Sequence, residues 1–446
     1  MYRMPNGQEM NATVLASLIS QNQSYHNAAI LEYENYKGEN LPIASRVFTD
    51  TTKVNNKIAS GFRKEIVDQS TGFLFGRPVN YLLEESVSDT DKKIFAQFLR
   101  RNAFPVLDLE TGKRSAINGT CARLVYIDKQ GLEKAIYCPA EQVIFVYDSS
   151  YSYVQYAIRY YTQEDALINA SGVITNAEVY DATNVMFYNN KSGSYDLTGS
   201  MPHGFDIIPL VEFANNEERQ SDFAQVVTQI TDYDIVTSDV SNEIAEFRNA
   251  YMLFKNCTMN AEARAAARLT GGIDVPQDGD VSFLTKQINP EFVKNHKDDQ
   301  RDDIYRFSSS VDMTSELFTG SGASGETRKW LLAALETKVA MKEMKFKQSS
   351  DNMFRVLATL WKKKGINIDE TMITYQIDRT YPQELGLEAD IQNKLKGVVS
   401  DKTRLSVLSI VPDVEQEIKR IDEEQSERQI KGVEEGESDV NADDND

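Results

Sequence analysis

The residues of this sequence whose type and spacing best suit chemistry are four aspartates, Asp298, Asp299, Asp302 and Asp303. On a helix, residues three or four apart lie on one face, so these carboxylates could hold Mg²⁺ or Ca²⁺ as in a metal-dependent nuclease. Lys294, Lys297 and Arg301 are interspersed with them, and a solvated face of mixed charge explains the same pattern more simply. We expect no metal site here and keep nucleic-acid cleavage as an alternative hypothesis.

Other catalytic signatures are missing from the sequence. The stretch GSGASG at 320–325 has neither the preceding strand nor the terminal Lys of a phosphate-binding loop, and no GxxxxGK[ST] occurs. There is no HExxH and no GxSxG, and the histidines, His26, His203 and His296, suggest no triad. We therefore expect a protein that is not an enzyme and needs no cofactor.

Composition limits the class of protein further. The chain has 446 residues, a formal charge of −20, 41% hydrophobic and 10% aromatic residues, which predicts two or three folded domains. Such a charge excludes a surface that grips nucleic acid everywhere, but it does not exclude DNA that passes nearby without being held. The stretch 432–446 carries seven of the carboxylates and no Lys or Arg, and we expect this tail to be disordered.

The cysteines and the N-terminus indicate the compartment. Cys121, Cys138 and Cys257 form no CxxC or Cys/His pattern and are expected to be reduced thiols. No signal peptide and no membrane-spanning apolar run is visible, so we expect a soluble, intracellular protein.

The first half of the chain predicts an α+β domain. Helices are expected at 8–37, ending at Gly38, and at 56–72. Between Val79 and Phe213, short segments rich in Val, Ile, Tyr and Phe predict strands, with a helix at 92–104 between them.

Long helices dominate the second half. Residues 222–256 carry an apolar seam at steps of three and four that only Thr237 breaks, which predicts one very long helix. An insertion at 257–290, a second helix to Met313 and a Gly/Ser-rich loop at 314–327 without regular structure should follow. A further seam predicts a helix at 328–364, interrupted at Lys342 and Ser349. A strand at 372–378 should return to the α+β domain, before closing helices at 382–396, 402–410 and 414–429.

Four stretches in this order resemble the portal proteins of tailed bacteriophages, specifically those of siphophages with Gram-positive hosts. They are NNKIASGFRKEIVDQSTGFLFGRPVNY (55–81), CPAEQVIFVYD (138–148), IIPLVEFANNEERQSDF (207–223) and LKGVVSDKTRLSVLSIVPDVEQEIKRIDEE (395–424). In one place the sequence departs from the family: Glu326, Thr327 and Arg328 follow Ser324-Gly325, where relatives often have a small residue and Leu. The resemblance therefore does not indicate what that loop contacts.

The resemblance implies an α+β portal-like subunit with a mixed wing, a two-helix stem, a small α/β clip, a long wing helix and a helical crown. The implied regions are an N-terminal arm 1–29, wing 30–228, stem helix 229–256, clip 257–290, stem helix 291–313, tunnel loop 314–327, long wing helix and strand 328–381, crown 382–430 and acidic tail 431–446. Portal subunits form a ring of about twelve at one capsid vertex. This protein would then be part of the virion, and in the host cytoplasm during assembly.

The resemblance also implies partners and site residues. Double-stranded DNA would pass through the ring, and the terminase large subunit, a head-completion adaptor, and the major capsid and scaffolding proteins would contact it. Expected tunnel-loop residues are Thr314, Ser315, Glu316, Leu317, Phe318, Thr319, Gly320, Ser321, Gly322, Ala323, Ser324 and Gly325. Expected DNA-facing residues are Arg328, Lys329, Lys338, Lys342 and Lys345, and expected partner-binding residues of the clip are Arg264, Arg268, Asp274, Asp278 and Asp280.

Physical reasoning favours the same role. A channel through which DNA slides should not bind phosphates tightly, because each neutralised phosphate strengthens binding through counterion release. A net-negative subunit with sparse positive residues fits that requirement, although the same lysines could simply form a solvated helix face. A third hypothesis is another virion component, such as a minor capsid or scaffolding protein, which would lack a channel.

Overall fold

The computed structural model describes residues 2–5, 7–151, 153–163, 174–191, 193–247, 251–258, 260–272, 275–284, 289–319, 327, 330–379, 385–408, 410–411, 414 and 416–424. The chain divides into two compact units, Met1–Thr380 and Tyr381–Asp446. The first unit is a mixture of sheets and helices, as the sequence predicted. In the ranges just given, no helix is both long enough and apolar enough to cross a membrane.

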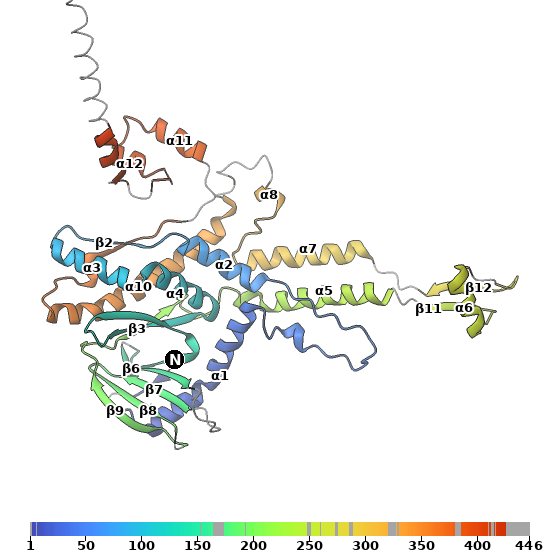
Figure 1. Cartoon of the computed structure of the whole chain (residues 1–446), viewed down its shortest axis with the longest axis horizontal. Coiled ribbons are helices and arrows are strands. Elements are labelled where there is room, and N and C mark those ends of the chain that lie inside the picture. The colour runs from blue at the N-terminus through green and yellow to red at the C-terminus, as the bar shows by residue number, and fades with distance from the viewer. Residues whose placement is uncertain are drawn as a thin grey trace, which may run out of the picture. The chain divides into compact units, whose positions relative to one another are not determined.

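The larger sheet of the first unit has six strands in the order β1-β5-β6-β7-β8-β9 (Figure 1). These are β1 Tyr2–Arg3, β5 Val143–Tyr147, β6 Val154–Gln163, β7 Ile174–Tyr180, β8 Asn184–Asn189 and β9 Asp196–Pro202. Because side chains alternate along a strand, Ile144, Val146 and Ile158 share one face, which Leu15 of helix α1 (Ala12–Lys37) covers. Helix α1 ends at Gly38 as predicted, with this glycine in the left-handed conformation that suits it.

A three-stranded sheet packs on the opposite face of the larger one. Its order is β10-β3-β4, with β3 Thr120–Ile127, β4 Glu133–Cys138 and β10 Leu210–Ala214. Leu124 and Leu210 pack with Val143 and Ala157 of the larger sheet. The alternate residues, such as Arg123 and Phe213, point to the other side, so the two sheets form a sandwich against a layer of helices.

Four helices form that layer, α2 Phe62–Phe75, α3 Asp89–Arg101, α4 Phe104–Asn118 and α10 Ala333–Lys363. Aromatic side chains hold them together: the Trp361 ring lies 5.6 Å from Phe98, which lies 5.3 Å from Phe104. The seam predicted for α10 is confirmed, since Leu335, Val339, Phe346, Met353, Val356 and Leu360 are buried. Strand β13 (Ile373–Gln376) then pairs with β2 (Asn80–Leu83), so the prediction that this strand returns to the α+β region is also confirmed.

Two long helices, α5 Val227–Phe247 and α7 Pro290–Phe307, lie side by side (Figure 1). Phe62 of α2 joins Ile230 and Ile304 in a core at their base. Pro290 begins α7, as predicted from its position. Beyond α5, strands β11 (Tyr251–Lys255) and β12 (Asp280–Leu284) pair around helix α6 (Ala261–Thr270), and α8 (Glu316–Thr319) follows α7.

The second unit contains the helices α11 Leu385–Lys394 and α12 Asp401–Leu405. Ser400 caps α12, because its hydroxyl accepts a hydrogen bond from the Thr403 backbone N–H at 3.3 Å. Residues 416–424 are also helical, so the helical character predicted for this region is confirmed.

The prediction of one helix over 222–256 was wrong at the C-terminal end of this range. Helix α5 stops at Phe247, and Tyr251–Lys255 forms a strand instead. The seam residues Tyr251 and Phe254 match a helical period, but the run YMLF also has the aromatic and apolar composition of a strand. Pairing with β12, some thirty residues later, decides the outcome.

Other differences involve segments without a strong period. Residues 56–60 were expected to be helical but have no regular secondary structure, and α2 begins only at Phe62. Helix α4 and strands β7 and β9 were not predicted. Gly112 in α4 allows close packing with α2, because a Cβ there would lie 2.1 Å from the Phe75 ring. The loop predicted at 314–327 to lack regular structure includes the single helical turn α8.

Candidate functional site

The charged residues of helix α5 are all acidic. Residues 227–247 contain five carboxylates, Asp232, Asp234, Asp239, Glu243 and Glu246, and no Lys or Arg. Helix α7 packs against it through polar contacts: Gln300 donates to Asp232, His296 Nε2 lies 3.8 Å from the same carboxylate, and Lys297 Nζ lies 4.9 Å from the Tyr233 ring centroid. Asp234 is 1% exposed and Arg46 lies 2.7 Å from Asp239, so the negative charge of α5 is partly buried and partly neutralised by neighbouring segments.

Two of the four aspartates of α7, Asp298 and Asp302, form ion pairs with Arg301. Arg301 lies 3.1 Å from Asp298, 3.2 Å from Asp302 and 3.7 Å from Asp312. Within the described part of the chain, no three His, Cys, Asp or Glu residues come together as metal ligands. Arg301 neutralises two of the four carboxylates that a metal would need, which favours the solvated face of mixed charge over a nuclease site.

A segment that we call the strap, residues 56–60, has no regular secondary structure and runs along α5. Its backbone N–H groups at Asn56, Ile58 and Ser60 donate to Asn242 at 2.7 Å, Ser238 at 2.9 Å and Asp234 at 2.7 Å, respectively. The acceptors are four residues apart on one helix face, and the donors are two apart along the strap, so the two repeats match in length. Arg46 joins the strap to the helix as well, since it donates to the Asn56 carbonyl and to Asp239.

We expect the strap to depend on these acceptors. Asn242→Ala removes the partner of the Asn56 N–H and should lower the free energy of unfolding by about 1–2 kcal/mol. Amide hydrogen exchange at residues 56–60 should also become faster. Thr228→Ala is the matched control, because Thr228 is exposed on the same helix and bonds only its neighbour Gln229 among the contacts described. Equal exchange rates in both variants would contradict this role of Asn242.

A buried group of polar side chains, which we call the polar cluster, lies at the base of the helix pair. Its members are Ser70 of α2, Asn215 and Asp222 of the segment after β10, and Lys338 and Lys342 of α10. Lys342 Nζ lies 2.7 Å from Asp222 Oδ2 and donates to Ser70 Oγ at 3.1 Å. Asn215 donates to Asp222 Oδ1 at 2.8 Å, and Ser70 also donates to this carboxylate. The cluster thus joins three segments that are distant in the sequence.

Lys338 connects the cluster to α7. Its Nζ donates to the backbone carbonyl of Ser308 at 2.9 Å and to that of Asp222 at 3.2 Å. Ser308 follows the last residue of α7, so one ammonium group connects the end of this helix to α10. Burial lowers the pKa of Lys338, and the Asp222 carboxylate opposes this shift.

Opposing effects set the charge of Asp222. Burial alone would raise its pKa, but the ammonium groups of Lys342 and Lys338 and hydrogen bonds from Lys342 and Ser70 outweigh burial. The pKa of Asp222 is therefore held well below its usual range, and the cluster contains a permanent carboxylate.

The expected DNA-facing lysines need correction. The side chains of Lys342 and Lys338 are 7% and 15% exposed and pair with Asp222, so neither is available to meet DNA in this subunit. Lys345 pairs with Glu217 beside the cluster. Arg328 and Lys329 lie outside the described residues, and their role stays a prediction. Lys342 interrupts the apolar seam of α10, and this was the signal, since a lysine in a buried stripe needs a buried counter-charge.

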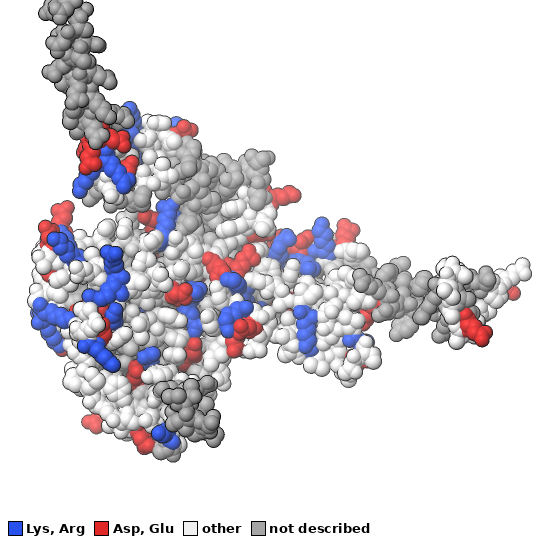
Figure 2. Space-filling view, viewed as in Figure 1, with Lys and Arg blue, Asp and Glu red and all other residues white. Residues whose placement is uncertain are grey.

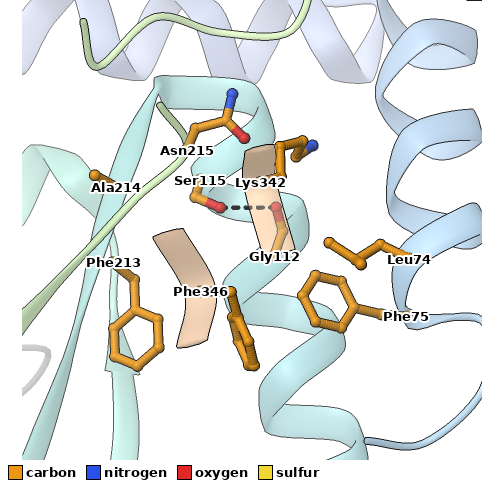
Figure 3. Close-up of a pocket in the computed structure, with 9 residues that line it drawn as sticks. All are labelled: Leu74, Phe75, Gly112, Ser115, Phe213, Ala214, Asn215, Lys342 and Phe346. Atoms are coloured by element: carbon orange, nitrogen blue, oxygen red, sulfur yellow. Dashed lines mark hydrogen bonds between the residues drawn. The ribbon is translucent and has the colours of Figure 1, made fainter. Parts of the chain in front are cut away.

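A small cavity of about 10 Å³ adjoins the polar cluster (Figure 3). Leu74, Phe75, Gly112, Ser115, Phe213, Ala214, Asn215, Lys342 and Phe346 line it. In Figure 3 the rings of Phe75, Phe213 and Phe346 lie on one side of it, with Asn215 and Lys342 on the other. This volume is that of about one water molecule. The cavity is therefore a small gap in the packing between helices and sheet rather than a ligand site.

The region predicted as the clip is a small structure of its own. Asp280 lies in β12, 3.8 Å from Lys255 of β11, and the Asp278 carbonyl accepts from Asn256 at 3.4 Å. Asp274 and the side chains of Arg264 and Arg268 lie outside what the structure describes. Leu269 on α6 is 88% exposed.

The predicted tunnel loop is described only at its beginning. Asp312 accepts hydrogen bonds from Thr314 N and Oγ1 at 2.8 and 2.6 Å, which forms a turn before α8. Residues 320–326 lie outside the described residues, including the glycines on which the loop prediction rested. The role of this loop remains a prediction.

No continuous basic field covers the surface in view. Figure 2 shows Lys and Arg side chains mixed with Asp and Glu over the face that it presents. Nucleic-acid-binding surfaces gather their basic residues into a patch or stripe. This face is therefore unlike a surface that holds DNA.

Comparison with known proteins gives a consistent result. Residues 16–431 match the sequence profile of the family described as "Phage portal protein, SPP1 Gp6-like". The portal protein of Bacillus phage SPP1 is 27% identical over 408 residues, covering 86% of this chain and 79% of that protein. The portal protein of Clostridium phage phiCD119 is 24% identical over 404 residues, covering 81% and 83% of the two chains.

Proposed function

Because this chain belongs to the family of SPP1 Gp6-like phage portal proteins, we propose that about twelve copies form a ring at one vertex of a phage capsid. Portal proteins are structural components of the virion and connect its head to its tail. In this proposal, double-stranded DNA enters and leaves through the axis of the ring. The terminase large subunit docks on the ring during packaging and a head-completion adaptor replaces it afterwards, while the major capsid and scaffolding proteins surround it.

Each region of the chain has a place in this proposal. Helices α5 and α7 form the stem, and β11, α6 and β12 form the clip that meets the terminase and later the adaptor. The sheets with α1 to α4 and α10 form the wing, and the second unit forms the crown. Residues 314–327 form the loop that borders the channel, and assembly takes place in the host cytoplasm.

The observation that carries the proposal is the charge of α5. Residues 227–247 carry five carboxylates and no Lys or Arg, and Arg46, which touches the helix, is paired with Asp239. Such a helix suits a wall past which DNA slides, because it offers phosphates few cations to bind. The strap and the polar cluster support the same role, because they fix the base of this helix to the wing by hydrogen bonds and a buried ion pair. A stem that transmits force between motor and capsid needs such a rigid attachment.

Packaging in extracts tests the function. Capsids assembled with the protein should protect DNA from nuclease after terminase and ATP are added, and capsids assembled without it should protect none. The control is the same extract with purified protein added only after capsid assembly, because a vertex component cannot enter a closed shell. Equal protection in all three reactions would contradict the proposed function.

A further inference from the structure

A groove of about 970 Å³ lies between the sheets and α10. One wall is α10, with Lys345, Gln348, Asn352 and Arg355, and the other is formed by Tyr153–Tyr156 and Asp181–Thr183. Strand β10 lines it with Leu210, Glu212 and Ala214. The polar cluster and the roles proposed above do not use this groove.

Strand β10 presents an unpaired edge to the groove. Its only partner among the described strands is β3, and hydrogen bonds from Val125 N to Pro209 O and from Asn215 N to Gly119 O fix which residues face that partner. In an antiparallel ladder the intervening residues direct their N–H and C=O away, so those of Leu210, Glu212 and Ala214 point into the groove. A row of such groups is a template for another strand.

The charged side chains around the groove are already satisfied within the subunit. Arg219 donates to both oxygens of Glu212 at 2.6 and 2.8 Å, Lys345 pairs with Glu217, and Arg355 lies 2.8 Å from Glu370. A charged ligand would have to break these pairs. Backbone hydrogen bonding is the interaction that the groove still offers, which favours an extended peptide.

The same chain has a second unpaired edge. Strand β9 is the last strand of the larger sheet, pairs only with β8 among the described strands, and all seven of its residues are exposed. Leu197 and Met201 are 56% and 54% exposed on a strand with a single charged residue, Asp196. Pro202 ends the strand without an N–H, and a bulge lies opposite Phe187 and Tyr188, so the part of the edge that can pair is short and centres on Ser200. This part is exposed and uncharged, which suits it to a partner strand.

We propose that β9 of one copy of the chain adds to β10 of a neighbouring copy and lies in its groove. This rests on the proposed ring, which supplies that neighbour. The two edges belong to different surfaces of one subunit, so their contact is heterologous and repeats head to tail, as ring closure requires. The register with β8 directs the N–H and C=O of Ser200 away from β8, toward the incoming edge.

Removing one outward N–H of β9 tests whether its backbone pairs with β10 of the neighbouring copy. Ser200→Pro removes a donor that the subunit itself does not use, whereas Ser200→Ala keeps it. We expect the proline variant to form rings with an association constant lowered roughly tenfold per contact, and the alanine variant to match wild type. Circular dichroism and the melting temperature of the dissociated subunit should be alike in all three. Unchanged ring formation by a folded Ser200→Pro variant would overturn the proposal.

Disulfide trapping tests the location without weakening the contact. In a Cys257→Ser background, since Cys121 and Cys138 are buried, Leu197→Cys with Gln348→Cys should give a ladder of linked oligomers on mild oxidation. The control is Leu197→Cys with Leu82→Cys, because Leu82 is 46% exposed on β2 but outside the groove. Rings that give no ladder would overturn this inference and leave the proposed function intact. Absence of rings in the wild-type protein would overturn both.

Discussion

Replacing Asp222 with alanine should lower the free energy of unfolding by about 3–5 kcal/mol, because it leaves the buried ammonium group of Lys342 without its counter-charge. The side chains of Asp222 and Lys342 are 1% and 7% exposed, so water cannot replace the lost partner. Lys338 and Asn215 would lose contacts in the same step. We expect this loss in urea unfolding followed by circular dichroism.

Two further variants distinguish the loss of the buried counter-charge of Lys342 from the general effect of removing a carboxylate. Asp206→Ala breaks the 2.6 Å pair with Lys363, whose side chains are about half exposed, and should cost under about 1 kcal/mol. Asp222→Ala combined with Lys342→Met removes both charges and should recover part of the stability lost in the single variant. Equal effects of Asp222→Ala and Asp206→Ala would contradict the account of the polar cluster.

The pH dependence follows from the same carboxylate. The pKa of Asp222 is lowered in the folded protein, so its stabilising effect is fully present above the ordinary pKa of an aspartate. That effect is lost only as the pH falls through the lowered folded value. The stability difference between wild type and Asp222→Ala should therefore be constant from neutral pH down to about pH 5 and narrow only in stronger acid.

Substituting Gly119 by alanine should destabilise the protein by more than about 4 kcal/mol. Gly119 follows α4 with φ of +76°, and a Cβ there would lie 2.0 Å from the Arg219 carbonyl oxygen and 2.3 Å from its carbon. Those atoms are backbone and belong to the segment that carries Asn215 and Asp222, so they cannot move without disturbing the polar cluster. Gly119 thus allows the close approach of α4 and this segment.

Gly131→Ala is the matched control. Gly131 has nearly the same φ, +77°, but no atom lies within 4 Å of the position that a Cβ would take there. The substitution should lower the free energy of unfolding by only about 1–2 kcal/mol, the cost of holding a residue with a Cβ in the left-handed backbone conformation. Melting temperatures and soluble yields of the two variants measure the difference. Similar melting temperatures and yields would contradict a tight contact between Gly119 and the Arg219 backbone.

The sequence predicted those parts of the fold that have a strong period or a local signal. The seam of α10, the start of α7 at Pro290 and the cap at Gly38 follow from spacing and turn chemistry, and the structure confirms them. The strand at 251–255 and the strap at 56–60 were assigned to helices, because their partners lie far away in the sequence. Period alone cannot reveal such pairing.

The candidate site was harder to predict than the fold. Lys342 was assigned to a DNA-facing surface, although its position inside an apolar stripe already indicated burial. Its partner Asp222 is 120 residues distant, and no local pattern connects the two. Arg123 shows the same limit: it is fully buried in a strand and pairs with Asp108 of α4 at 2.8 Å, a contact that exists only after the sheet and helix pack.

The proposed function requires that this chain form a ring with an open axis. The most direct test is the native mass of the purified protein by light scattering, together with top views by negative-stain electron microscopy. We expect a particle of about twelve subunits with a central hole. A monomer, a dimer or a closed assembly without an axial channel would contradict it.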